Sequence, residues 1–527
     1  MQKGESALEQ KGATERRGEV AVRMRGITKT FGSRVVANHN AHLEVRWGEI
    51  LALLGENGSG KTTLMNMLAG IYYPDSGEIE VNGREVSIRS PRDAFELRIG
   101  MIHQHFKLVD VLTAAENIVL GLPGGVTLNR RAVAARIRAI GEKYGFALDP
   151  EKKIYNMSVS EKQTVEIVKA LYRGADILVL DEPTAVLTPQ EIEKLFAVLR
   201  AMREDGKAII IITHKLGEVL AISDRVTILR KGEYVDTVPT ATASVQSLTE
   251  GMVGHAVRLE IERPQLPRGE ELLRVQNVTC LNADHVCKVK NVSFSAYGGE
   301  ILGVAGVAGS GQKELCEAVA GIQNVRGGSI LFRTGDGYEN IVGMKPDVIF
   351  EKGVSLAFVP EDRLGMGLVA SMDMVDNVML RSYKAGKGPF VDRRSARRVC
   401  QTLIDQLEIV TPGVFTPVRR LSGGNVQKVL LGREIYHHPR VLMVSYPVRG
   451  LDINSSYKIY DLLNEQKRRG VAVIFVGEDL DVLMEISDRL MVLCGGEVSG
   501  IVDPREVSKD DVGLLMMQAP GKEAADA

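Results

Sequence analysis

Short runs of apolar residues alternate with longer amphipathic segments along this chain. Three of the runs have the length of buried strands: Ile50–Leu54, Ile177–Leu180 and Ala208–Ile212. The segments between them are typical of helices, and this alternation predicts an α/β core with a largely parallel sheet. Residues 105–175 are rich in helical patterns, which indicates a helical subdomain beside that core.

No apolar run approaches the roughly 20 residues that a helix needs to cross a bilayer. The N-terminal residues are polar and charged, and they lack the apolar region of a signal peptide. We therefore expect a chain that stays in the cytoplasm unless a partner holds it at a membrane.

The chain contains an internal repeat. Gly-Glu-Ile at residues 48–50 returns at 299–301, and Ser-Asp-Arg at 223–225 returns at 487–489. The register holds elsewhere, apart from a net insertion in the middle of the second copy. A repeat of this length predicts two domains of the same fold, which suits a chain of 527 residues because single hydrophobic cores stop growing well below that size.

The two copies are separated by a polar segment with two prolines, which is typical of a linker. Each copy is predicted to form a domain with its own core. We accordingly divide the chain into a disordered tail at 1–19, a first domain at 20–258, a linker at 259–270, a second domain at 271–518 and a second tail at 519–527.

Composition excludes some classes of function. The formal net charge is −1, with 44% apolar and 25% charged residues, so the chain is folded and globular and lacks the basic excess of a general nucleic-acid binder. The arginine pairs at 393–394 and 397–398 are typical of a solvated helix face. The five cysteines are scattered without zinc-like spacing, which indicates reduced thiols rather than disulfides or a metal site.

A glycine-rich loop follows the first apolar strand. Gly55-Glu-Asn-Gly-Ser-Gly-Lys61-Thr62 matches the GxxxxGK[ST] pattern, and a helical run comes next from Thr63. Glycines let backbone N–H groups turn toward phosphate oxygens at a helix N-terminus. Lys61 can reach the β- and γ-phosphates, and the Thr62 hydroxyl can ligate Mg²⁺. The candidate nucleotide-binding residues in this loop are Gly55, Glu56, Asn57, Gly58, Ser59, Gly60, Lys61, Thr62 and Thr63.

Further candidates follow the other apolar strands. The strand Ile177–Leu180 leads into Asp181 and Glu182, which suits Mg²⁺ binding by Asp181 and polarisation of the attacking water by Glu182. His214 follows the next apolar strand, where a γ-phosphate sensor could lie. Gln104 is placed to contact both Mg²⁺ and the water.

The order of these motifs resembles that of the ABC ATPases: a P-loop, a glutamine loop, a signature sequence, a Walker B strand and a switch histidine. The resemblance covers about residues 20–515 and extends most clearly to the twin-cassette ATP-binding subunits of bacterial importers for simple sugars, nucleosides and related small molecules. The runs His103-Gln-His-Phe106 and Val359-Pro-Glu-Asp-Arg363 support it. The resemblance implies two tandem P-loop NTPase cassettes, each with a mostly parallel sheet core and a helical subdomain. It also implies that Phe31 stacks on adenine.

The second copy lacks most of the chemically important side chains. In the register of the repeat, Lys61 becomes Gln312, Thr62 becomes Lys313, Phe31 becomes Asn282, Asp181 becomes Ser445, Glu182 becomes Tyr446 and His214 becomes Glu478. The phosphate-binding lysine, the metal ligands, the carboxylate and the sensor are missing, so we do not expect hydrolysis there. Gly306, Gly309 and Gly311 remain, and weak nucleotide binding stays open.

The signature loops differ in the opposite sense. Leu421-Ser-Gly-Gly-Asn425 is close to the LSGGQ of ABC ATPases, whereas Met157-Ser-Val-Ser-Glu161 has neither glycine and is expected to place a carboxylate near phosphate. In ABC ATPases the P-loop of one cassette faces the signature of the other. The resemblance therefore implies that the second copy completes the site of the first through Ser422, Gly423, Gly424 and Asp452. We expect one hydrolytic and one inert site with the cassettes paired within one chain, and pairing between chains stays open.

The resemblance implies partners outside this chain. They are two transmembrane permease subunits, which would hold the chain at the cytoplasmic face of the inner membrane, and indirectly an extracytoplasmic substrate-binding protein; no nucleic acid is expected. The implied ligands are ATP and Mg²⁺. Sugar, nucleoside and vitamin cargoes stay open, and residues 170–175 favour nucleosides weakly. The alternative is a soluble twin-cassette ATPase acting on ribosomes, but such proteins usually keep both sites intact and carry a long charged linker.

Overall fold

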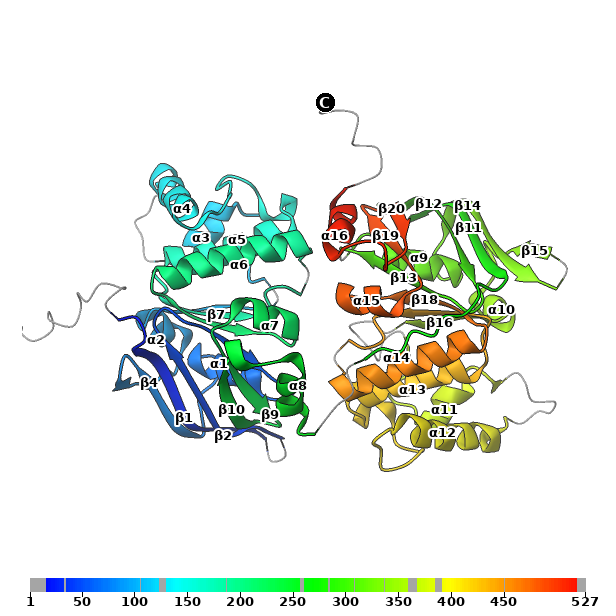
Figure 1. The fold of residues 1–527 in the computed structure, drawn as a ribbon, viewed down its shortest axis with the longest axis horizontal. Coiled ribbons are helices and arrows are strands. Elements are labelled where there is room, and N and C mark those ends of the chain that lie inside the picture. Colours follow the sequence, from blue (N-terminus) through cyan, green and yellow to red (C-terminus); the bar gives the residue numbers. More distant parts are fainter. Residues whose placement is uncertain are drawn as a thin grey trace, which may run out of the picture. The chain divides into compact units, whose positions relative to one another are not determined.

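The computed structural model describes most of the chain. The described ranges are 16–32, 35–104, 106–122, 129–185, 187–255, 260–282, 285–307, 309–335, 337–358, 367–383, 391–449 and 451–518. The chain divides into two compact units, Met1–Arg258 and Leu259–Ala527, and each is described by itself (Figure 1). The run Val359–Arg363 and His105, which contributed to the resemblance, lie outside the described residues.

Unit 1 is built around a six-stranded sheet with the order β10-β9-β3-β8-β7-β6. Neighbouring strands are parallel, except for β9 and β10. The strands are β3 (Ile50–Leu54), β6 (Ile99–Ile102), β7 (Ile177–Asp181), β8 (Ala208–Ile212), β9 (Arg225–Arg230) and β10 (Glu233–Pro239). The three strands predicted from the sequence are β3, β7 and β8, and the predicted α/β class is confirmed.

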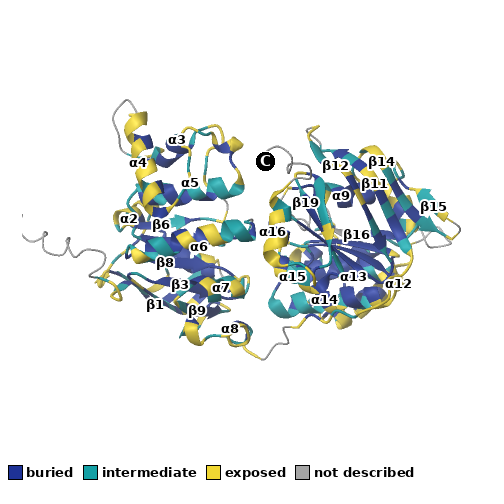
Figure 2. Cartoon of the chain, turned by 45° about the horizontal axis from the view of Figure 1, so that its top comes forward, coloured by how far each residue is buried: buried dark blue, intermediate teal, exposed yellow. Residues whose placement is uncertain are grey.

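Every residue of β3, β7 and β8 is buried, and Figure 2 shows β3 and β8 in dark blue. Successive side chains of a strand point to opposite faces, and here they enter two separate cores. Leu51 packs in the core that contains α1 (Lys61–Leu68), whereas Leu178 packs in the core that contains α6 (Pro189–Glu204). Because both faces are covered, these strands are continuous apolar runs in the sequence.

A second, antiparallel sheet covers the core that contains α1, with the strand order β2-β1-β4-β5. Its strands are β1 (Val20–Phe31), β2 (Val35–Arg46), β4 (Ser76–Val81) and β5 (Arg84–Glu85). The loop that precedes β1 is bonded to the sheet, because the Gly18 N–H donates to the Trp47 carbonyl oxygen (3.0 Å).

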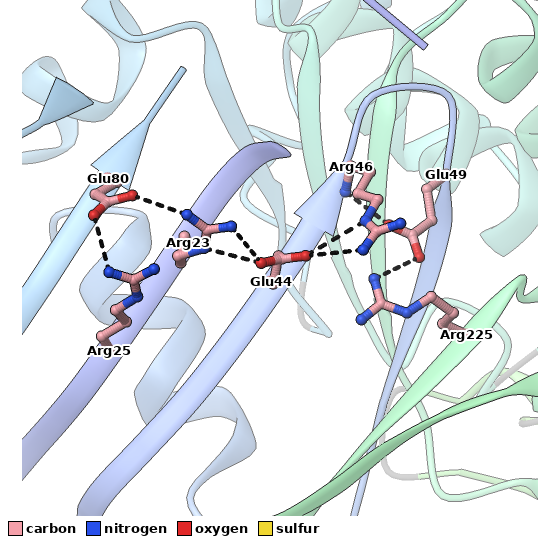
Figure 3. Close-up of polar contacts among 7 residues, drawn as sticks. All are labelled: Arg23, Arg25, Glu44, Arg46, Glu49, Glu80 and Arg225. Carbon is pink, nitrogen blue, oxygen red and sulfur yellow. Dashed lines mark hydrogen bonds and ion pairs between the residues drawn. The ribbon is translucent and has the colours of Figure 1, made fainter. Parts of the chain in front are cut away.

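Alternating charges cross this antiparallel sheet (Figure 3). Arg23 on β1 lies directly opposite Glu44 on β2 and Glu80 on β4, and it pairs with them at 2.8 and 3.5 Å. The chain of contacts continues through Arg46 to Glu49, whose carboxylate accepts from the Arg46 N–H (2.7 Å). Partly exposed pairs contribute at most about 1 kcal/mol each. We infer that the charges mainly favour the correct strand register.

The helical segment predicted at 105–175 forms a subdomain of unit 1 with a core of its own. Its described helices are α3 (Ala114–Val119), α4 (Arg130–Tyr144) and α5 (Val159–Tyr172), and a short 3-10 helix, η1 (Ile154–Asn156), precedes α5. Capping boxes at Thr113 and Ser158 begin α3 and α5. The remaining helices of unit 1 are α2 (Pro91–Glu96), α7 (Leu216–Ile222), η2 (Thr240–Thr242) and α8 (Val245–Val253).

Unit 2 repeats this topology. Its sheets have the orders β12-β11-β14-β15 and β16-β17-β18-β13-β19-β20. The strands are β11 (Glu271–Leu281), β12 (Cys287–Tyr297), β13 (Ile301–Gly306), β14 (Val325–Thr334), β15 (Gly337–Asn340), β16 (Val354–Phe358), β17 (Val441–Ser445), β18 (Ala472–Val476), β19 (Arg489–Cys494) and β20 (Glu497–Val502). The helices are α9 (Gln312–Val319), α10 (Pro346–Glu351), α11 (Met374–Met379), α12 (Arg393–Leu407), η4 (Val418–Arg420), α13 (Gly423–Tyr436), α14 (Ile453–Arg468), α15 (Leu480–Ile486) and α16 (Lys509–Met517).

The structure shows the surroundings of the arginine pairs, of the cysteines and of the segment between the two predicted domains. The arginines at 393, 394, 397 and 398 lie on the exposed face of α12, as predicted. All five cysteines are free. The segment 260–270 contains no helix or strand, and it belongs to unit 2: Ile261 is buried in the core of that unit, and Arg263 donates to the Ser487 carbonyl oxygen (2.7 Å). None of the described helices is long and apolar enough to cross a bilayer.

Unit 2 buries a charged cluster beside β16. Glu434 of α13 is completely buried, and its carboxylate pairs with Arg433 (2.7 Å) and Arg381 (3.0 Å). The hydroxyl of Ser355 on β16 donates to the same carboxylate (2.6 Å). Burial by itself raises the pKa of Glu434, but the two guanidinium groups and the hydroxyl outweigh it, so the pKa lies below the ordinary value of 4.5.

We expect Glu434→Gln to lower the free energy of unfolding of unit 2 by about 3–5 kcal/mol, because it removes the counter-charge of a buried guanidinium group. The folded-state pKa of Glu434 is depressed, so its stabilisation is present above pH 4.5 and is lost as the pH falls through the folded pKa. Urea unfolding of wild type and variant should therefore converge on acidification from neutral pH. Glu96→Gln, at an exposed pair with Arg92, should leave the unfolding midpoint unchanged. A difference that stays constant with pH would contradict this assignment.

Candidate functional site

The glycine-rich loop of unit 1 connects β3 to α1. Helix α1 begins at Lys61, two residues before the predicted start, and Gly60 precedes it in the left-handed conformation (φ 89°). A Cβ on Gly60 would lie 2.3 Å from the carbonyl oxygen of Ala37 on β2, so only glycine fits there. The first N–H groups of a helix have no partner within the helix. Those of α1 are therefore available to a phosphate.

Lys61 turns back over its own loop. It is 6% exposed, and its ammonium group donates to the carbonyl oxygens of Gly55 (2.6 Å) and Glu56 (2.9 Å). Burial lowers the pKa of Lys61 to about 8, against the opposing effect of Glu182 and Asp181. A cation held in this way can exchange the carbonyl oxygens for phosphate oxygens, which carry more negative charge.

Asp181 and Thr62 offer two oxygen ligands side by side. The Thr62 hydroxyl lies 3.5 Å from a carboxylate oxygen of Asp181. Burial, and then the neighbouring Glu182, raises the pKa of Asp181 to about 6. Mg²⁺ prefers oxygen ligands and usually takes one or two from the protein and the rest from phosphates and water. The pair fits Mg²⁺ completed by a nucleotide, and the described residues contain no metal cluster of three or more acidic, His or Cys side chains.

The Glu182 carboxylate is held from two sides. Gln104 donates to one oxygen (2.6 Å), and His214 Nδ1 lies 3.0 Å from the other. The hydrogen bond with His214 lowers the pKa of Glu182, in spite of burial. Glu182 also has a left-handed backbone (φ 46°) and donates its N–H to the Ile212 carbonyl oxygen (2.9 Å). The structure thus brings the three predicted catalytic residues into direct contact.

The remaining predicted residues of unit 1 surround this group. Phe31 lies at the end of β1, with its ring 37% exposed and edge-on to Tyr72 at 5.1 Å. Ser59 is buried, Asn57 and Gly58 are exposed, and Thr63 is half-buried. Phe31 is therefore a partly exposed aromatic residue of the kind that an adenine can stack on, and the Lys29 ammonium group lies over its ring, 5.8 Å from the centroid.

Unit 2 keeps the loop but not its chemistry. Gly311 is left-handed (φ 96°) and α9 begins at Gln312, whose amide donates to the Val307 carbonyl oxygen (3.1 Å) where Lys61 would carry a charge. Tyr446 takes the left-handed position of Glu182 (φ 52°), and burial raises its pKa to about 12. Glu478 pairs with Arg449 (3.2 Å). The described part of the loop thus keeps the backbone of a nucleotide site, while Tyr446 and Glu478 occupy the positions of Glu182 and His214.

Two stretches of the chain, residues 38–185 and 289–447, match the family model described as ABC transporter. The chain belongs to the ABC transporter family. Each match runs from the second strand of the antiparallel sheet, through the glycine-rich loop, to the residues just after the Walker B strand. Units 1 and 2 are therefore two ABC cassettes, and ATP is the nucleotide that such cassettes bind.

The chain is similar over almost its full length to ATP-binding subunits of importers. It is 40% identical to a nucleoside import ATP-binding protein of Lactococcus lactis, over 95% of this chain and 98% of the relative. It is 40% identical to a guanosine import ATP-binding protein of Bacillus subtilis, over 97% and 99%. It is 38% identical to a glucose import ATP-binding protein of Haloferax volcanii, over 94% and 96%.

The two signature loops have different contacts. In cassette 2, Ser422 is exposed and begins α13, and its hydroxyl accepts from the Asn425 side chain (2.8 Å); Gly423 and Gly424 follow in the first turn. Asp452 begins α14 by accepting from the Ser455 N–H (2.8 Å). In cassette 1 the Glu161 carboxylate accepts from the Ser158 N–H (2.7 Å) and pairs with Lys152.

The sequence motifs did not identify two residues that support the site. Asn38 of β2 is completely buried and donates to the Gly60 carbonyl oxygen (3.3 Å), which supports the glycine-rich loop. Glu166 of α5 accepts from the Lys107 N–H (2.7 Å) and so fixes the chain just after Gln104. Their contacts are made across the fold, and no local motif marks them.

Two of the three glycines of the first P-loop, Gly58 and Gly60, give a matched test. Gly58 and Gly60 are both left-handed, but a Cβ on Gly58 would meet nothing within 4 Å. We expect Gly58→Ala to cost about 1–2 kcal/mol from backbone strain alone. Gly60→Ala should cost clearly more, since the new methyl group meets the Ala37 carbonyl. Thermal and urea unfolding would measure both variants, and equal losses would contradict the close approach of β2 to the loop.

Proposed function

We propose that this chain is the ATP-hydrolysing subunit of an importer for a nucleoside, a simple sugar or a related small solute, with a single competent ATP site. One observation supports the single site above others. In cassette 1, Gln104 and His214 both bind Glu182, and Lys61 and Asp181 interact electrostatically with the same carboxylate. Cassette 2 has Gln312, Ser445, Tyr446 and Glu478 in place of Lys61, Asp181, Glu182 and His214.

Binding begins with the phosphates. Lys61 and the free N–H groups at the start of α1 would bind the β- and γ-phosphates, and Phe31 would stack on the adenine. Thr62, Asp181 and Gln104 would hold Mg²⁺, which when bound neutralises phosphate charge. The pKa of Asp181, about 6, leaves its carboxylate mostly ionised at neutral pH.

Hydrolysis then depends on Glu182. Its lowered pKa keeps the carboxylate ionised, so it can accept a hydrogen bond from the attacking water and orient it. His214 and Gln104 each bind one carboxylate oxygen and so fix the direction of the group. Once phosphates are present, His214 can also donate to the γ-phosphate.

The second cassette supplies the other half of the competent site. Ser422, Gly423, Gly424 and Asp452 would face the nucleotide held by Lys61, since the signature of cassette 2 keeps both glycines while that of cassette 1 has neither. Shared binding of the γ-phosphate would draw the cassettes together, and hydrolysis would let them part. With the two cassettes paired within one chain, the P-loop, Walker B residues and His214 of cassette 1 would share a site with the signature of cassette 2. The altered counterparts would form the other site.

The chain would act at the cytoplasmic face of the inner membrane. Permease subunits would carry the solute across, and an extracytoplasmic binding protein would deliver it. The names of the relatives include nucleoside, guanosine, glucose and ribose import proteins. Two nucleoside proteins at 40% identity favour a nucleoside as the cargo.

We expect Glu182→Gln to abolish ATP hydrolysis, because an amide cannot take the place of the ionised carboxylate. Gln312→Ala should barely alter the rate, since no hydrolysis is expected in cassette 2. Phosphate release at saturating ATP would measure both. Equal losses in the two variants would contradict the single competent site.

We expect the tagged protein, recovered from mildly solubilised membranes, to bring multi-span permease subunits with it. In proteoliposomes with those permeases and their binding protein, nucleosides should stimulate ATP hydrolysis in wild type and not in Glu182→Gln. Stimulation by a simple sugar alone would assign a sugar cargo. Recovery of ribosomal proteins without a permease would contradict the importer function.

A further inference from the structure

Glu218 of α7 joins two loops that lead away from the catalytic residues of cassette 1. One of its carboxylate oxygens accepts from the hydroxyl of Thr184 (2.5 Å) and lies 3.4 Å from that of Thr213. Thr184 follows Glu182 by two residues, and Thr213 directly precedes His214. One carboxylate thus connects the loop after β7 with the loop after β8.

Lys215 closes the same arrangement. Its ammonium group pairs with the second carboxylate oxygen of Glu218 (3.2 Å) and lies 3.4 Å from the Thr184 carbonyl oxygen. Thr184 and Thr213 are 2% and 3% exposed, so both hydroxyls are shielded from water. A hydrogen bond from a buried hydroxyl to a carboxylate is among the stronger ones in proteins. We call Thr184, Thr213, Lys215 and Glu218 the loop clasp.

Cassette 2 provides an internal comparison. In the register of the repeat, the loop clasp becomes Val448, Gly477, Asp479 and Val482. Val448 and Val482 pack against the core of cassette 2, and Asp479 caps α15 instead. The fold therefore forms without the loop clasp, and the clasp is absent from the cassette that lacks Glu182 and His214.

We propose that Glu218 is a positioning residue for ATP hydrolysis, acting through Thr184 and Thr213 to hold Glu182 and His214 at their 3.0 Å separation. The proposal rests on the ATPase function proposed above. The loop clasp uses no atom of the nucleotide, so it keeps the two loops in register while the phosphates come and go. Small displacements of a catalytic group cost large factors in rate.

The test uses the residues that cassette 2 itself carries. We expect Thr184→Val and Glu218→Val each to lower kcat by on the order of tenfold, with the KM for ATP unchanged within about twofold. Combining them should lower kcat little further, because either one opens the same clasp. Thr184→Ser keeps the hydroxyl and should retain most of the activity. Glu96→Ala, at an exposed pair on α2, is the control and should match wild type.

Other results would distinguish a failure of the loop clasp proposal from a failure of the proposed function. If Thr184→Val matches wild type while Glu182→Gln is inactive, the loop clasp has no positioning role and the proposed function stands. Equal losses in Thr184→Ser and Thr184→Val, or a change in KM alone, would also overturn the proposal. If Glu218→Val does not fold, the two Thr184 variants decide, since they leave the carboxylate in place. An inactive wild-type protein would instead contradict the proposed function.

Discussion

The parallel pairing of β7 with β8, and of β8 with β3, decides where the P-loop, the Walker B carboxylates and His214 of cassette 1 lie. Parallel strands bring their carboxyl ends to one edge of a sheet. Asp181 is paired with Ile212, and the Glu182 N–H extends the ladder by one more hydrogen bond to Ile212. The P-loop, the Walker B carboxylates and His214 therefore meet at one edge, although they are far apart in the sequence.

The same pairing operates in cassette 2 without the chemistry. Tyr446 donates its N–H to the Val476 carbonyl oxygen (2.8 Å) in the left-handed conformation that Glu182 also adopts. The scaffold thus tolerates Tyr446 where cassette 1 has its carboxylate, since the ladder uses only backbone groups. At the loop clasp, cassette 2 has apolar packing by Val448 and Val482 where cassette 1 has polar contacts. The reverse occurs at another position. Glu434 is buried among guanidinium groups, whereas Ala170 takes its place in cassette 1.

Much of this architecture could be predicted because its signals are local or repeated. Runs such as Ile50–Leu54 and Ala208–Ile212 match the observed strands, since strands buried on both faces have no polar positions to blur their limits. The start of α1 was less well predicted. For Lys61 the sequence predicted a contact with phosphates, but it did not predict that the fold buries the ammonium group against two carbonyl oxygens, where burial lowers its pKa to about 8.

The sequence by itself determined the two copies, the glycine-rich loops, the acidic pair at the end of β7 and the asymmetric loss of side chains in the second copy. These depend on spacing and on residue type, which are both visible along the chain. Only the tertiary structure revealed that Glu218 bonds to Thr184, that Glu161 turns toward Lys152 and that Glu434 is buried. The reason is physical: an exposed and a buried carboxylate have the same letter, and the partners that distinguish them come from distant elements through packing.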